Sequence, residues 1–141
     1  LLILNGIVMT NNTIINIQDW PVCSMNTFPS SMGETQQWLA ELELLLAKKE
    51  SFSLIYPPMK PKGKPTAEDM ECMKTVRRWL KDAREGMVKY CQAMVITLQS
   101  DGSDKLEMEK MVPVISSLYG PEVYLEENAL LAQKRAVSVL N

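Results

Sequence analysis

Three lysines set among prolines are the first residues of this chain that could do chemistry. Lys60, Lys62 and Lys64 alternate with prolines in the segment 57–65, which also contains Gly63. Four prolines and a glycine exclude regular secondary structure, so the segment is predicted to be a solvated loop. Ammonium groups attract anions, which makes Lys60, Lys62, Gly63 and Lys64 a candidate site for an anion or an acidic partner. The alternative is an exposed loop that binds nothing, because flexible charges add little affinity without a preformed pocket.

Thr66 follows this loop at the predicted start of a long helix, with Glu68 and Asp69 in the first turn. Backbone N–H groups and the helix dipole favour a phosphate at such a position, so Thr66 is a candidate phosphorylation site. The alternative is a plain N-cap, whose hydroxyl accepts a hydrogen bond from the first turn of the helix.

Histidine is absent from the chain. Its absence removes Ser–His and Cys–His nucleophile pairs, the commonest general base and the imidazole ligands of most catalytic metals. Cys23, Cys72 and Cys91 are separated by 49 and 19 positions, and this wide spacing predicts reduced core thiols, not a disulfide or a metal site. Glycine-rich phosphate-binding motifs are also missing. We therefore predict a non-enzymatic protein without a cofactor or a metal.

The charge balance argues against nucleic acid as a partner. Fifteen Lys and Arg against 17 Asp and Glu leave a formal net charge of -2 over 141 residues, which creates no field for DNA, RNA or an anionic membrane. Reduced cysteines indicate a reducing compartment, and we predict a cytoplasmic location.

Composition also predicts the domain organisation. Hydrophobic residues make up 46% of the chain and charged residues 23%, values typical of one folded domain at this length. The apolar start, Leu1 to Val8, is too short to span a membrane and lacks the basic region of a signal peptide. We predict a disordered or non-native leader over residues 1–12 and a single domain over 13–141.

Alternating polarity or a short apolar run predicts a strand, and apolar residues three and four apart predict a helix. Strands are expected at 13–18, 22–28, 52–56, 93–99 and 122–126, and helices at 32–49, 66–91, between the turn at 100–103 and Gly120, and at 128–140. The order is β-β-α-β-α-β-α-β-α. It predicts a single α/β domain with a mixed, mostly parallel sheet flanked by helices and joined by right-handed crossovers.

The first predicted helix has a clear start and an apolar side. Ser31 and Glu34 form a capping-box pattern. Its buried stripe is predicted to be Trp38, Leu42, Leu45 and Leu46. Glu41 and Glu43 are expected to face water. In the third helix, Pro113 is expected to introduce a kink or a break.

The long helix carries an apolar stripe at helical spacing. The stripe consists of Met70, Met73, Val76, Leu80, Ala83, Met87 and Cys91. Its methionines could line an adaptable ligand groove, because thioether side chains repack easily, or they could simply fill the core. Four basic residues lie between these apolar positions: Arg77, Arg78, Lys81 and Arg84. Because Asp82 and Glu85 lie among them, these residues are expected to form a water-facing surface.

Several of these features occur in the order found in a known family. Trp20-Pro21 opens the second predicted strand, an apolar strand at 52–56 precedes a loop, and the long helix leads into the segment 90–95. In this respect the chain resembles STAS domains, and among them the small bacterial SpoIIAA-like proteins. The resemblance implies a non-catalytic regulatory domain that is phosphorylated on a serine at the start of the helix after the third strand. At that place this chain has the proline and lysine loop, and Thr66 is the nearest hydroxyl.

Two functions are compatible with these observations. The first, which the resemblance implies, is a protein–protein interaction module with an unknown protein partner, which could also form a homodimer. The second is a carrier of a small apolar ligand or lipid, in which the sheet and the long helix enclose a methionine-lined pocket beside the lysine loop.

Overall fold

The computed structural model describes residues 2–4, 7–9, 13–60 and 63–141. Its main sheet has the order β3-β4-β5-β6-β7, in which β3 is antiparallel to β4 and the other neighbours are parallel. The strands are β3 (Ile15–Asn16), β4 (Val22–Met25), β5 (Phe52–Tyr56), β6 (Cys91–Thr97) and β7 (Val123–Glu126). The helices are α1 (Met32–Ala47), α2 (Ala67–Tyr90), α3 (Lys105–Tyr119) and α4 (Ala129–Ser138). The predicted α/β class and the predicted order of elements from β3 onward are confirmed.

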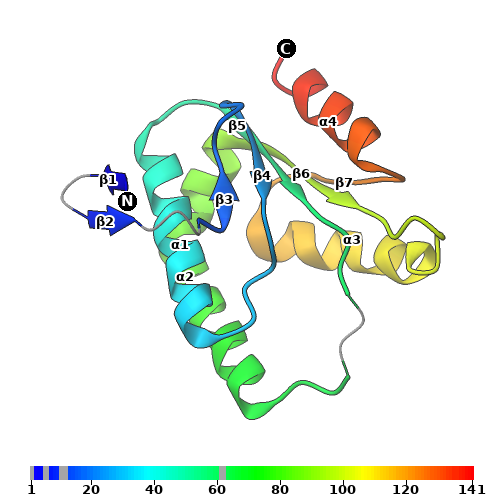
Figure 1. Ribbon diagram of the computed structural model, residues 1–141, viewed down its shortest axis with the longest axis horizontal. Coiled ribbons are helices and arrows are strands. Elements are labelled where there is room, and N and C mark those ends of the chain that lie inside the picture. Colours follow the sequence, from blue (N-terminus) through cyan, green and yellow to red (C-terminus); the bar gives the residue numbers. More distant parts are fainter. Residues whose placement is uncertain (1, 5–6, 10–12, 61–62) are drawn as a thin grey trace.

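The parallel strands lie side by side in chain order, and a helix connects each to the next. Right-handed crossovers between neighbouring strands place all the connecting helices on the same face of a sheet. Accordingly α1, α2 and α3 cover one face, while α4, which follows the last strand, packs on the other (Figure 1). We call these the three-helix face and the α4 face.

Each strand contributes side chains to the cores on both faces, because successive side chains of a strand point to opposite sides of the sheet. In β5, Phe52, Leu54 and Tyr56 belong to the core under the three-helix face, whereas Ile55 belongs to the core under α4. All five β5 residues are buried. This explains why the sequence of a central strand covered on both sides is almost wholly apolar.

The α1 helix begins as predicted but differs in two respects. Ser31 caps it by accepting a hydrogen bond from the Glu34 N–H at 3.1 Å. The Glu34 carboxylate, however, accepts hydrogen bonds from the N–H and the hydroxyl of Ser30. These bonds do not complete the predicted capping box, which requires the N–H of Ser31 as the donor. Leu46 is only half-buried, in contrast to the rest of the predicted stripe.

Glu41 is the clearest correction to the predicted surface. It is 5% exposed, not water-facing, and its carboxylate accepts hydrogen bonds from the backbone N–H groups of Ile14 and Ile15 at 2.7 to 3.2 Å. It also accepts one from the Gln37 amide at 2.8 Å. Backbone donors next to the edge of the sheet must find acceptors when buried, and α1 supplies a carboxylate.

The first hairpin is shorter than the sequence suggested. Its strands are two and four residues long, and Trp20-Pro21, which has a cis peptide bond, lies in the turn between them instead of in an extended segment. Hydrogen bonds from Trp20 N to Ile17 O and from Val22 N to Asp19 O close this turn.

Predictions for the other helices are partly wrong about exposure. In α2, Met70 and Met73 are 49% and 46% exposed, although Val76, Leu80, Ala83 and Met87 are buried as expected. In α3, Pro113 is accommodated inside one continuous helix. Leu106 and Val114 of that helix are 76% and 57% exposed.

The described part of the predicted leader forms a small hairpin, in which β1 (Leu2–Leu4) pairs antiparallel with β2 (Ile7–Met9). The remaining leader positions, 1, 5–6 and 10–12, lie outside the described residues, so the leader over 1–12 stays a prediction. Among the residues that are described, no helix has the length and apolar character needed to cross a bilayer.

Candidate functional site

An apolar pocket of about 360 Å³ lies between the three-helix face of the sheet and its helices. Its wall combines β4, β5 and β6, the loops after β4 and β5, and the three helices: Met25, Phe28, Pro29, Thr35, Trp38, Tyr56, Met59, Cys72, Met73, Val76, Arg77, Met94, Ile96, Met111, Ile115, Leu118 and Tyr119. Residues as far apart in the sequence as Met25 and Tyr119 therefore meet in one wall. Its volume falls at the lower end of the range of small-molecule sites.

Methionine is the commonest residue in this wall. Met25, Met59, Met73, Met94 and Met111 line it, which is half of the ten methionines in the chain. Thioether side chains are flexible and polarisable, so such a wall can adapt to apolar molecules of different shape. Of the methionines in the α2 stripe, Met73 lines this wall, Met87 is fully buried in the core, and Met70 is not among the described residues of the wall.

Two tyrosines supply polar groups at the inner wall. Burial raises the pKa of Tyr119 to about 12. Burial, together with the neighbouring Tyr119 and Cys91, raises the pKa of Tyr56 well above its ordinary value. Both phenols are therefore neutral at physiological pH, and each can donate or accept a hydrogen bond.

Trp38 adds an unsatisfied donor to the same wall. The side chain is 6% exposed, its ring lies 6.3 Å from that of Tyr119, and its buried Nε1 has no hydrogen-bond partner among the described residues. A buried N–H without an acceptor costs about 1–3 kcal/mol. The other polar group of α1 in the wall, the Thr35 hydroxyl, donates to the Ser31 carbonyl at 2.8 Å.

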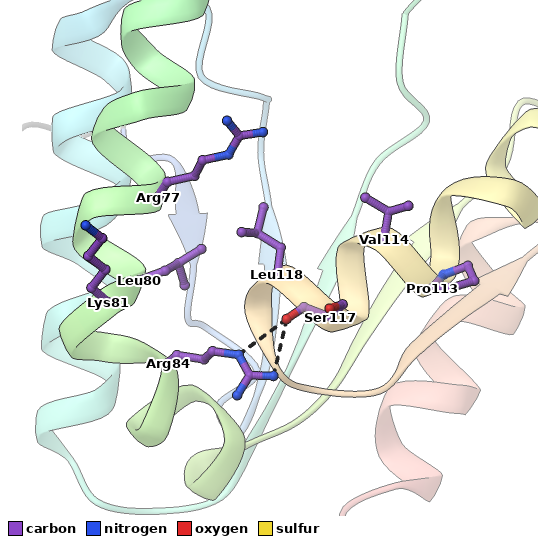
Figure 2. Close-up of a pocket in the computed structure, with 8 residues that line it drawn as sticks. All are labelled: Arg77, Leu80, Lys81, Arg84, Pro113, Val114, Ser117 and Leu118. Atoms are coloured by element: carbon purple, nitrogen blue, oxygen red, sulfur yellow. Dashed lines mark hydrogen bonds between the residues drawn. The ribbon is translucent and has the colours of Figure 1, made fainter.

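A basic groove of about 640 Å³ runs between α2 and α3. Its wall is formed by Arg77, Leu80, Lys81, Arg84, Pro113, Val114, Ser117 and Leu118 (Figure 2). The Arg84 guanidinium donates to the Ser117 carbonyl through Nε at 3.3 Å and through Nη2 at 3.2 Å. This contact ties α2 to α3 at one end of the groove.

The structure separates the mixed charges of α2 that the sequence analysis treated as one surface. Arg77, Lys81 and Arg84 recur at a spacing of four and three, so they share one side of the helix. Asp82 and Glu85 line no part of the groove. Among the described residues, the groove wall therefore carries three cations and no acid.

The groove and the apolar pocket adjoin each other. Arg77 and Leu118 belong to both walls, and among the described residues Arg77 is the only charged one in the pocket wall. Figure 2 shows its side chain extending from α2 toward the space between the helices. An apolar pocket thus opens beside a guanidinium group.

The described lysines of the loop, Lys60 and Lys64, line neither wall. Lys60, Gly63 and Lys64 are exposed, and a Cβ added to Gly63 would meet no atom within 4 Å. Lys62 falls outside the described residues. Only Met59, at the start of the loop, reaches the pocket, so the structure brings none of the described predicted anion-binding residues to it.

Thr66 acts as the N-cap of α2. Its hydroxyl accepts from the Asp69 N–H at 3.1 Å, and the Asp69 carboxylate accepts from the Thr66 N–H at 2.8 Å. This reciprocal capping box satisfies the start of the helix. Phosphorylation of Thr66 stays a prediction.

Sequence reasoning missed Trp38, Tyr56 and Tyr119 as site residues. They are 18 and 63 positions apart along the chain, and no spacing rule connects them. For the groove, a signal was present in the four-and-three spacing of Arg77, Lys81 and Arg84, but the intervening acids concealed it.

The cysteines and the acidic residues form no metal centre in the part of the chain that the structure describes. Burial raises the pKa of the Cys23 and Cys91 thiols to about 12, and Cys72 is half-buried in the pocket wall. Comparison of the chain with protein-family models, with curated proteins and with solved structures found no match.

Proposed function

We propose that this protein is a non-catalytic binding protein for a small apolar molecule, held in the apolar pocket. The observation that carries the proposal is a preformed 360 Å³ space whose wall is mostly apolar, with five methionines and four aromatic residues and few polar groups. Ligand sites of proteins have this composition. The proposal corresponds to the second of the two functions expected from the sequence.

The size of the pocket limits the ligand. At roughly 30 Å³ per water molecule in the liquid, 360 Å³ equals about twelve waters. A molecule of about ten to fifteen non-hydrogen atoms would fill it. This corresponds to a two-ring aromatic compound or a medium-length acyl chain.

The polar groups of the wall support a ligand that carries an oxygen. The Trp38 indole N–H is buried without an acceptor, and a ligand carbonyl or hydroxyl in the adjoining pocket could accept from it after a small shift of the ring. That hydrogen bond would relieve the cost of the unsatisfied donor.

A fluorescence titration with 1-naphthylamine, a neutral two-ring dye whose emission shifts to shorter wavelength in apolar surroundings, tests the proposal. We expect saturable binding at one site. Ile115→Trp, which places a larger side chain in the pocket wall, should raise the dissociation constant by at least about tenfold, equivalent to 1.4 kcal/mol.

Leu106→Trp is the matched control, because Leu106 lies on the same helix, is 76% exposed and lines no pocket wall. It should leave the dissociation constant unchanged. Met73→Trp, at a more exposed position of the wall, is the second test in case Ile115→Trp fails to fold. Equal dye binding by folded wild type and folded pocket variants would refute the proposal.

A protein–protein interaction module of STAS type is the second candidate function. It is supported by exposed apolar side chains of α3: Leu106 is 76% exposed, and Val114, which also lines the groove, is 57% exposed. Exposed apolar surface can mark a protein-interaction site. Sedimentation of wild type and Leu106→Glu tests self-association, and a monomeric wild type at all concentrations would remove the homodimer.

A further inference from the structure

We infer that the ligand is an anionic amphiphile, whose apolar part occupies the pocket and whose carboxylate or phosphate is bound by Arg77 in the basic groove. The inference rests on the proposed function and adds the chemical class of the ligand. It is carried by the adjacency of the groove and the pocket, whose walls share Arg77 and Leu118.

The charge of the groove favours an anion and no other head group. Arg77, Lys81 and Arg84 are the charged residues of its wall, in a protein whose formal net charge is -2. A cationic head group would be repelled there, and a neutral one would leave the cations without a counter-charge.

Arg77 and Lys81 are available for a ligand, in contrast to Arg84. Arg84 uses its guanidinium on the Ser117 carbonyl. The described residues include no acid within ion-pair distance of Arg77 or Lys81, since the ion pairs found there are Lys74–Glu71 and Arg135–Glu126. The planar guanidinium of Arg77 can bind two oxygens of a carboxylate or phosphate at once.

The position of Arg77 on the shared edge explains how an exposed cation could bind with useful affinity. An exposed cation alone binds an ion weakly, because solvent screens the attraction. An apolar chain seated in the adjoining pocket would hold the anion close to the guanidinium, so the two contacts would reinforce each other.

Isothermal titration calorimetry of the folded protein with 1-decanol, decanoate and decyl phosphate tests the inference by measuring the dissociation constant of each. The three share one chain, whose size suits the pocket, and differ in the charge of the head group. We expect the better of the two anions to bind at least about tenfold more tightly than decanol, the range of one charged hydrogen bond. Whichever anion binds more tightly identifies the head group.

Arg77→Gln should remove this advantage and leave decanol binding unchanged. Arg78→Gln is the matched control, because it deletes the same charge from the next residue of α2, which lines neither wall. It should change anion binding by less than about twofold, as expected for a screened surface charge. Lys81→Gln should have an effect between these two.

The results separate this inference from the proposed function. If none of the three probes binds, the proposed function fails and the inference fails with it. If decanol binds as tightly as both anions, the pocket binds ligands but the anionic head group is wrong. Equal losses of anion binding in Arg77→Gln and Arg78→Gln would also overturn the inference, because they would indicate attraction by general charge.

Discussion

The cores on the two faces of the sheet differ in the size of their side chains and in how completely they are filled. Under α4 the buried cluster has no aromatic residue and no methionine, and three of its six residues, Ala93 of β6 with Ala132 and Ala136 of α4, are fully buried alanines. Under α1, α2 and α3 the core contains Trp38, Phe52 and several methionines, yet it encloses the apolar pocket.

The difference reflects how closely a helix can approach a sheet. A helix that presents alanines can lie near the strands, so a small core closes completely. Helices that stand farther from the sheet depend on long side chains to fill the space, and flexible methionines leave room that a ligand can use. The core under α4 is therefore closed, whereas the core under the three-helix face leaves a pocket.

The greatest loss of folding stability is expected at high pH, and it arises from groups in the core of the three-helix face. Cys23, Cys91, Tyr56 and Tyr119 all pack in or against the core of the three-helix face, and burial raises the pKa of each, to about 12 for Cys23, Cys91 and Tyr119. The unfolded chain ionises these groups from about pH 9, whereas the folded protein keeps them neutral. Stability is therefore complete below pH 9 and is lost as the pH rises toward 12.

Urea unfolding at pH 8 to 11 measures this loss. Each group that is ionised only in the unfolded chain lowers the free energy of unfolding by up to about 1.4 kcal/mol per pH unit, so several kcal/mol should be lost. Tyr119→Phe should make the fall above pH 10 less steep. A wild-type free energy of unfolding that is the same at pH 8 and pH 11 would contradict the prediction.

The next largest effect is expected when a larger side chain is introduced on each face, because the cost in the free energy of unfolding should differ between the two faces. Ala136→Leu inserts a large side chain into the closed core under α4, and we expect a loss of about 2–3 kcal/mol in the free energy of unfolding. Cys72→Leu makes a comparable enlargement in the pocket wall, where space is available, and should cost less than about 1 kcal/mol. Similar losses for the two variants would mean that the pocket is not a real space.

The attachment of α4 can be tested through one hydrogen bond. The buried Ser53 hydroxyl of β5 donates to the Ala136 carbonyl of α4 at 3.0 Å. Ser53→Ala removes the donor and should lower the free energy of unfolding by about 1–2 kcal/mol. Dye binding in the pocket should be unaffected, because Ser53 faces away from it; a weaker binding would show that the two faces are coupled.

Trp38→Phe should have the smallest effect on stability. The substitution removes an unsatisfied buried donor, which is favourable, and part of a packed ring, which is unfavourable. We expect the two to offset each other to within about 1 kcal/mol in thermal and urea unfolding. A loss of 3 kcal/mol or more would show that the indole N–H has a partner, and Leu42→Ala, at a fully buried position of the same helix, provides the scale for a simple packing loss.

Much of the fold was predictable because its signals are local. Ser31, Thr66 and Asn128 mark three helix starts through their own side chains, each accepting from the first turn. The apolar run 52–56 predicts a central strand by itself. Glu41 shows where local signals fail: its partners, Ile14 and Ile15, lie 27 and 26 positions earlier, and a glutamate on a helix is ordinarily solvated.

The candidate site was less predictable than the fold. Met73 and Met70 occupy equivalent places in the α2 stripe, yet only Met73 lines the pocket. The difference depends on what lies opposite each side chain, which α3 and the loop after β5 decide. Likewise, the lysine loop was conspicuous in the sequence, but its described lysines contact neither pocket nor groove.

By itself the sequence determined the order of strands and helices, the helix caps and the absence of histidine chemistry, because these depend on residue type and short-range spacing. Only the tertiary structure decided which residues form the pocket wall and which charges of α2 face α3. Those properties arise where crossover helices pack side by side on one face of a sheet, and packing joins residues that no spacing along the chain relates.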